Sequence, residues 1–84
     1  MNFTFSQKMY TSKGVIQFDF LKIHTVRGIR YFVTAMDDKA HYHLFAMEQV
    51  NYAWTILDKE KVSGWIIELE EPLAQAIQGT IPSV

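Results

Sequence analysis

The chain has no cysteine among its 84 residues, and this absence excludes several kinds of site. A disulfide framework, a thiolate nucleophile, an iron–sulfur cluster and a cysteine-bound zinc ion all need cysteine sulfur. The absence of disulfides also fits a reducing compartment. The N-terminus, MNFTFSQKMY, has no basic region followed by an apolar stretch, so no signal peptide is visible. We therefore expect a cytoplasmic protein.

Glycine and proline are scarce, with four and two residues. The glycines stand apart at positions 14, 28, 64 and 79, so no glycine-rich loop is present to wrap a phosphate group. The longest stretch without charge, residues 72–84, is too short to cross a bilayer and is interrupted by glycine and proline. The sequence therefore predicts no membrane partner.

Groups suited to catalysis are also few. The serines at positions 6, 12, 63 and 83 have turn, cap or terminal positions or lack an evident base beside them. Glu68, Glu70 and Glu71 are typical of a solvated helix face. A carboxylate pair for acid–base chemistry would need an enclosing cleft, which so small a domain rarely builds alone. We expect neither an enzyme nor a cofactor.

Apolar side chains are abundant by contrast. Hydrophobic residues make up 49% of the chain and aromatic residues 14%, while 20% are charged, which is the composition of a folded domain. The length predicts a single domain over residues 1–84. This amount of apolar side chain is more than one thin layer hides. We expect a second buried face, most simply in a homodimer.

The charges are unevenly distributed along the chain. Residues 1–39 contain six basic and three acidic side chains, whereas residues 40–84 contain two basic and six acidic ones. Such asymmetry can indicate a partner for the basic half. A basic sheet that carries an acidic helix is the simpler interpretation.

Strand patterns dominate the first two thirds of the chain. Five stretches rich in β-branched and aromatic residues are separated by short polar turns, at residues 3–10, 15–25, 29–36, 41–48 and 52–57. In the second stretch, Ile16, Phe18 and Phe20 fall on one side, and Leu21 and Ile23 fall on the other. We therefore expect a β-bulge or a strong twist near residue 20.

A helical pattern follows the strands. Apolar residues recur at spacings of three and four, at Val62, Ile66, Leu69, Leu73, Ala76 and Ile77. Ser63 is a suitable N-cap, and Gly79 and Pro82 are stop signals. The pattern predicts one helix over residues 63–78, kinked at Pro72.

A second interpretation of this segment stays open. WIIELE (65–70) also alternates like a strand, and Pro72 would then be the first residue of a short separate helix. In either case the fold class is α+β, with an antiparallel meander sheet of four to five strands over about 3–58. One C-terminal helix, at about 63–78, packs on one face of the sheet, and a short tail covers 79–84.

The stretch HYHLFAM (41–47) raises the question of a metal site. His41 and His43 share a face if the segment is a strand, and His24 on a nearby strand could be a third ligand. No acidic residue is placed by a motif. His43 also shares its face with Phe45 and Met47, which favours packed histidines over a metal site.

Aromatic and basic residues alternate in the first part of the chain. Tyr10, Phe18, Phe20, Tyr31 and Phe32 are interleaved with Lys8, Lys13, Lys22, Arg27 and Arg30. Aromatic rings on a sheet can stack on unpaired bases while cations follow the phosphates. Strand aromatics can equally form the core or a dimer interface.

The order of elements resembles the purine-rich-element-binding (PUR) family. The similarity rests on YTSKG (10–14), QFDF (17–20), RGIRYFVT (27–34) and a helix that ends in LAQAI (73–77). The resemblance implies a dimer that binds single-stranded DNA or RNA on its sheet, through Tyr10, Lys13, Phe18, Phe20, Arg27, Arg30, Tyr31 and Phe32. The strand YAWTIL (52–57) is an addition that the family's repeat lacks.

The sequence thus leads to three functional hypotheses. The first is a small non-enzymatic module for protein interaction or assembly, which we expect to be homodimeric. The second is a single-stranded DNA- or RNA-binding domain. The third is a metal or small-ligand site at His24, His41 and His43.

Overall fold

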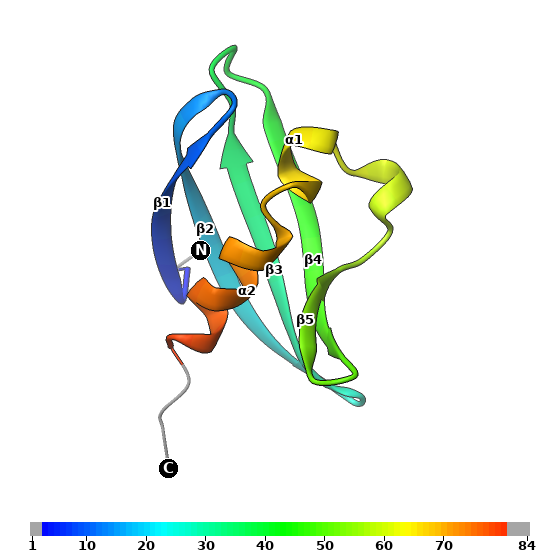
Figure 1. The fold of residues 1–84 in the computed structure, drawn as a ribbon. Coiled ribbons are helices and arrows are strands. Elements are labelled where there is room, and N and C mark those ends of the chain that lie inside the picture. The colour runs from blue at the N-terminus through cyan, green and yellow to red at the C-terminus, as the bar shows by residue number, and fades with distance from the viewer. Residues whose placement is uncertain (1–2, 81–84) are drawn as a thin grey trace.

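The computed structural model describes residues 3–80, and within them the chain forms one antiparallel sheet followed by short helices (Figure 1). The five strands are β1 (Phe5–Thr11), β2 (Gly14–Thr25), β3 (Gly28–Met36), β4 (Tyr42–Val50) and β5 (Ala53–Ile56). They lie side by side in chain order, so that β3 is the central strand. The antiparallel meander and the α+β class that the sequence predicted are confirmed.

The first two hairpins close in the same way, because each has a threonine, a basic residue and a glycine at matching positions. Thr11 Oγ1 accepts a hydrogen bond from the backbone N–H of Lys13 at 2.9 Å and donates one to the Gly14 carbonyl at 2.8 Å. Thr25 makes the same pair of bonds around Gly28. Gly28 has a φ of 126°, a backbone conformation that residues with a side chain adopt only with strain. The sequences TSKG and TVRG therefore act as turn motifs.

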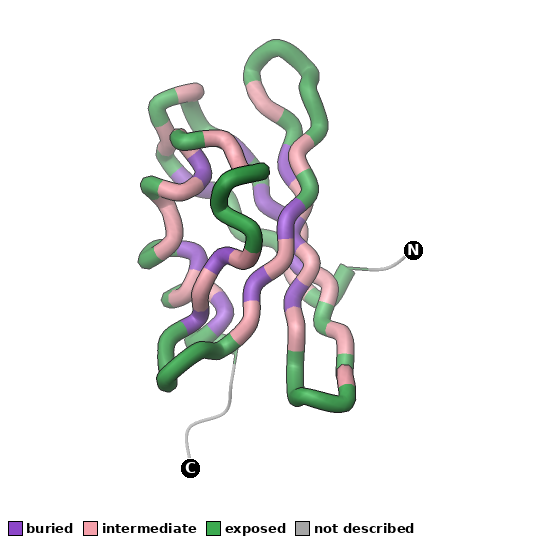
Figure 2. Tube along the Cα trace, turned by 90° about the vertical axis from the view of Figure 1, so that its right-hand side faces the viewer, coloured by how far each residue is buried: buried purple, intermediate pink, exposed green. Residues whose placement is uncertain are grey.

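Burial alternates along the central strands, as strand geometry requires. Phe18, Phe20, Val33, Phe45 and Met47 are buried on one side, and the residues between them are partly or fully exposed (Figure 2). We call the side with the buried residues the core face. The opposite side, which carries Leu21, Ile23, Phe32, Thr34 and Leu44, is the open face.

Aromatic side chains fill much of the core face. Phe5 stacks on Phe20 with ring centroids 4.3 Å apart, and Tyr31 meets Trp54 edge to face at 5.3 Å. Such pairs add to the stability that burial of their area provides.

The chain then turns through a short 3-10 helix (Lys59–Lys61), α1 (Gly64–Ile67) and α2 (Glu70–Gln78). Ile66, Leu73 and Ile77 are fully buried and belong to the same cluster as the buried strand residues. Glu70 links the start of α2 to the last strand, because its carboxylate accepts the backbone N–H of Ile56 at 2.8 Å. No helix within residues 3–80 is long and apolar enough to cross a membrane.

Two details of the sequence prediction are wrong. The residue pairing of β2 with β1 and with β3 runs without a break, so the bulge that was one of the two alternatives near residue 20 is absent. Phe20 and Leu21 simply point to opposite faces, and both faces are apolar. The segment 63–78 is not one helix kinked at Pro72 but two helices separated at Glu68 and Leu69. Neither is 65–70 a strand. Pro82 lies outside the described residues.

Candidate interaction surface

The open face of the sheet carries a shallow apolar hollow. Its volume is about 440 Å³. Thr34 contributes the one polar side chain among the residues that line it, which are Phe3, Leu21, Ile23, Phe32, Thr34 and Leu44. Cross-strand pairing places these groups together: Leu21 lies opposite Phe32, and Thr34 lies opposite Leu44. β2, β3 and β4 therefore supply one continuous apolar surface.

Several large apolar side chains extend this surface and are strongly exposed. Leu44 is 69% exposed and Tyr42 is 75% exposed. Tyr10, Val15 and Met36 are also exposed, and the alternation of each strand places them on the open face. Monomeric proteins rarely expose contiguous apolar patches of more than a few hundred Å². The open face is thus a candidate for contact with a partner.

The charged groups on the open face are held mainly by partners within the chain. Arg30 Nε donates to Glu48 Oε2 at 2.6 Å, and the Arg30 guanidinium lies 5.8 Å from the centre of the Phe32 ring. Asp19 accepts hydrogen bonds from the Ser6 hydroxyl and from the Gln17 side-chain amide. These groups would therefore remain paired if a partner excluded water from the face.

Three of the residues assigned to nucleic-acid binding are buried in the core. Phe18 and Phe20 are 0% exposed and Tyr31 is 2% exposed. A base cannot stack on a ring that the fold already buries. The assignment of these three side chains to a binding surface is therefore corrected: they form the core, because alternation puts them on the core face.

The other five assigned residues do not form one cluster. Tyr10 and Lys13 lie at the end of the sheet where β1 meets β2, and Arg27 lies in the turn at the opposite end of β2. A strand of 12 residues separates these ends, which corresponds to about 40 Å. Arg30 and Phe32 lie between them on the open face.

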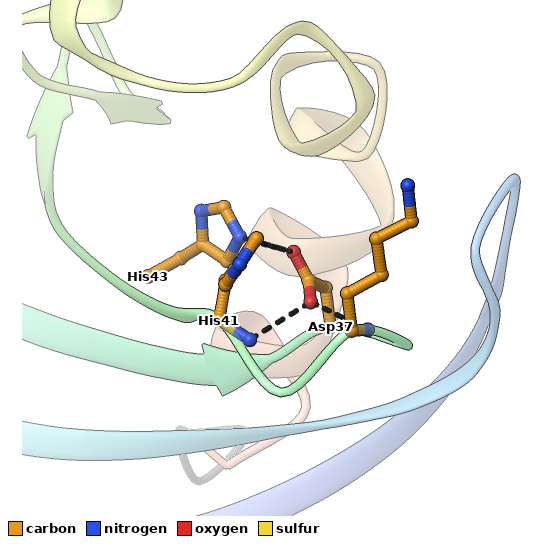
Figure 3. A network of polar contacts seen from close by, with 4 residues as sticks. Asp37, His41 and His43 are labelled. Atoms are coloured by element: carbon orange, nitrogen blue, oxygen red, sulfur yellow. Dashed lines mark hydrogen bonds and ion pairs between the residues drawn. The ribbon is translucent and has the colours of Figure 1, made fainter.

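His41 and His43 meet an acidic residue that the sequence did not single out (Figure 3). His43 Nε2 lies 3.0 Å from Asp37 Oδ2, and His41 Nδ1 lies 3.7 Å from the same oxygen. Asp37 Oδ1 accepts the backbone N–H groups of Lys39 and His41, so one carboxylate holds the turn between β3 and β4. The His43 ring also meets Trp65 edge to face at 5.4 Å.

These contacts change the acidity of Asp37. The hydrogen bond with His43 has the largest effect, and the backbone N–H groups of His41 and Lys39 add to it. Together they outweigh the opposing effect of burial and hold the pKa of the Asp37 carboxyl well below its usual range. The Asp37 side chain is only 8% exposed. These contacts indicate that Asp37 and His43 stabilise the turn between β3 and β4.

The structure does not bring the three histidines together. Both histidines pair with residues of β3: His43 lies opposite Ala35, and His24 lies opposite Ile29, six residues earlier on that strand. The two rings are therefore about 20 Å apart along the strand direction. Among residues 3–80 no group of three His, Cys, Asp or Glu side chains is placed to hold a metal ion. The metal site hypothesised at His24, His41 and His43 is thus not assembled in the described part of the chain.

The residues lining the hollow that the sequence did not assign to a site are Phe3, Leu21, Ile23, Thr34 and Leu44. The available signal was the presence of apolar residues on both sides of the strands, which indicated a second apolar face without showing which residues belonged to it. Cross-strand register supplies that information.

Comparison with known proteins adds no relative to this description. No family model matches the chain, and no curated protein or solved structure gives a significant match. The candidate site is therefore defined by its geometry alone.

Proposed function

We propose that this domain is a non-enzymatic protein-interaction module, and that the open face of its sheet is the binding surface. In this proposal the helices cover the core face and leave the open face to the partner. The observation that carries it is the apolar hollow lined by Leu21, Phe32 and Leu44 on a face rich in exposed apolar side chains. Water contact with such a surface is unfavourable, and a partner that removes it provides the driving force for binding.

The chemistry of the face supports a protein partner. Protein interfaces have an apolar centre, with aromatic residues and methionine enriched and a polar rim. The open face has Phe32 and Leu21 at its centre, with Tyr42 and Met36 farther along the strands. The paired Arg30 and Glu48 lie beside this apolar centre.

Single-stranded nucleic acid is the alternative partner for the same face. The specific observation in its favour is that Arg30 and Phe32 lie next to each other there. The alternative requires Arg30 to exchange Glu48 for a phosphate group. It predicts a rise in the anisotropy of labelled single-stranded DNA that weakens steeply as salt increases.

An uncharged apolar dye tests the proposed binding surface. At low protein concentration, Nile red should bind the wild-type chain and gain fluorescence, since the hollow offers it an apolar site. Leu44→Gln should lose most of this signal, because the change places an amide over the hollow. The control Val26→Gln, at a fully exposed hairpin position outside the open face, should match the wild type. Equal signals from all three proteins would place the dye elsewhere and count against the proposal.

A further inference from the structure

We propose that the partner of the open face is a second copy of this chain, packed face to face about a two-fold axis. This inference rests on the proposed function, because it names the occupant of the same surface. It is supported by the size of the face, its balance of charge and its position in the sheet.

The size of the face matches the requirement of a stable dimer. Five strands spaced about 4.8 Å apart and about eight residues long give a face of roughly 24 by 26 Å, or about 600 Å² in projection. Standard protein interfaces bury about 800 Å² of accessible surface per partner, and accessible surface exceeds a flat projection. The open face is therefore of the same order of size as the surface that a standard interface buries on each partner.

The charges on the face are balanced, so that a copy would not repel it. Alternation places Lys8, Asp19, Arg30 and Glu48 on the open face, which gives two charges of each sign. Arg30 and Glu48 already neutralise each other within the chain. The whole chain has a net charge of −1. A charge so close to zero favours self-association.

The position of the apolar centre suits two-fold symmetry. Phe32 and Thr34 lie on β3, the middle strand of the five. When two identical sheets pack face to face, the two-fold axis lies in the plane between them. An axis near the middle of the face brings β3 of one protomer against β3 of its partner. Leu21 and Leu44, on the flanking strands, then complete the same apolar contact on both sides.

Sedimentation velocity over a dilution series, from about 1 µM to about 500 µM, tests the inference. The wild type should pass from monomer to dimer within this range. Leu44→Gln should raise the dissociation constant at least about tenfold, because a two-fold interface contains the substitution twice. Val26→Gln should leave it unchanged. If Leu44→Gln does not fold, Tyr42→Ser on the same face replaces it.

Two results would overturn the inference. One is a wild-type dimer that Leu44→Gln and Tyr42→Ser leave intact, since the dimer would then use another surface, such as the edge of β1. The other is a wild type that stays monomeric throughout. In that case, the amount of Nile red bound per chain would show whether the open face is still a binding surface, although a second copy is not its partner. Binding that persists at all concentrations would leave the face open to a different protein, whereas no binding at any concentration would remove both proposals.

Discussion

At the scale of single residues, Asp37 shows how much of the local structure one side chain can determine. Its carboxylate closes the turn between β3 and β4 through two backbone N–H groups and also contacts His43, which packs on Trp65 of α1. One residue thus connects a hairpin to the helical segment. The ionised form is the one that these donors favour.

The effect of pH on stability follows from this preference. The ordinary pKa of an aspartate is about 3.9, and the folded-state pKa of Asp37 lies below it. The ionised carboxylate therefore favours the folded state above about pH 4, and this contribution is lost as the pH falls through the folded-state pKa. Asp37→Asn should lower the free energy of unfolding at pH 7, and the difference from wild type should shrink at pH 2.

Urea denaturation at pH 7, 4 and 2 measures this difference. Asp38→Asn is the matched control, because Asp38 is the neighbouring carboxylate and is exposed; it should change stability little at any of the three pH values. A difference between Asp37→Asn and wild type that stays constant down to pH 2 would show that the carboxylate charge is not the cause.

The sequence predicted the roles of His41 and His43 only in part. The spacing of His41 and His43 indicated either a metal site or packed histidines, and the residue that engages both is Asp37, six positions before His43. The sequence DDK (37–39) identified a turn there. It could not show that one of the two aspartates points back along the next strand, because that depends on turn geometry.

At the scale of elements, the strands and the presence of a helical segment were predictable, but the break within that segment was not. Each strand lies within two residues of its expected limits, because alternation and turn residues act locally. The helical break reflects Pro72. A continuous helix would need the missing N–H of Pro72 to bond the Glu68 carbonyl, and the proline ring would clash with that carbonyl. The chain therefore breaks at Glu68, and Pro72 falls in the first turn of α2, where no N–H is needed.

The turn between β4 and β5 contains a strained position that yields a second prediction. Asn51 and Tyr52 have φ values of 51° and 70°, as a two-residue turn of type I′ requires, and Tyr52 is 95% exposed. A left-handed conformation costs a residue other than glycine roughly 1–2 kcal/mol. Tyr52→Gly should therefore raise the free energy of unfolding by about 1 kcal/mol in urea denaturation.

The control for this change is Ala53→Gly in the adjoining strand. Glycine has no conformational advantage in a strand, so this substitution should lower the free energy of unfolding by about 0.5–1 kcal/mol. If Tyr52→Gly destabilised the protein as much as Ala53→Gly does, the Tyr52 ring would have to make a stabilising contact that outweighs the backbone strain.

At the scale of the whole molecule, composition carried the most useful information. The surplus of apolar side chains predicted a second buried face, and the open face is apolar but exposed in the single chain. The sequence could not tell which face is the core, because Phe18 and Phe20 on one side and Leu21 and Ile23 on the other are equally apolar. The buried members of the alternating aromatic and basic pattern were mistaken for surface residues for the same reason.

The central claim is that the open face is the contact surface, and a single introduced cysteine tests it most directly. The chain has no cysteine of its own, so a short bismaleimide can link only the introduced thiols. Thr34→Cys, in the middle of the open face, should give a cross-linked dimer that free competing wild-type chain suppresses. Val26→Cys, at the exposed hairpin, should remain largely monomeric. Cross-linking of Val26→Cys that equals or exceeds that of Thr34→Cys would contradict the account.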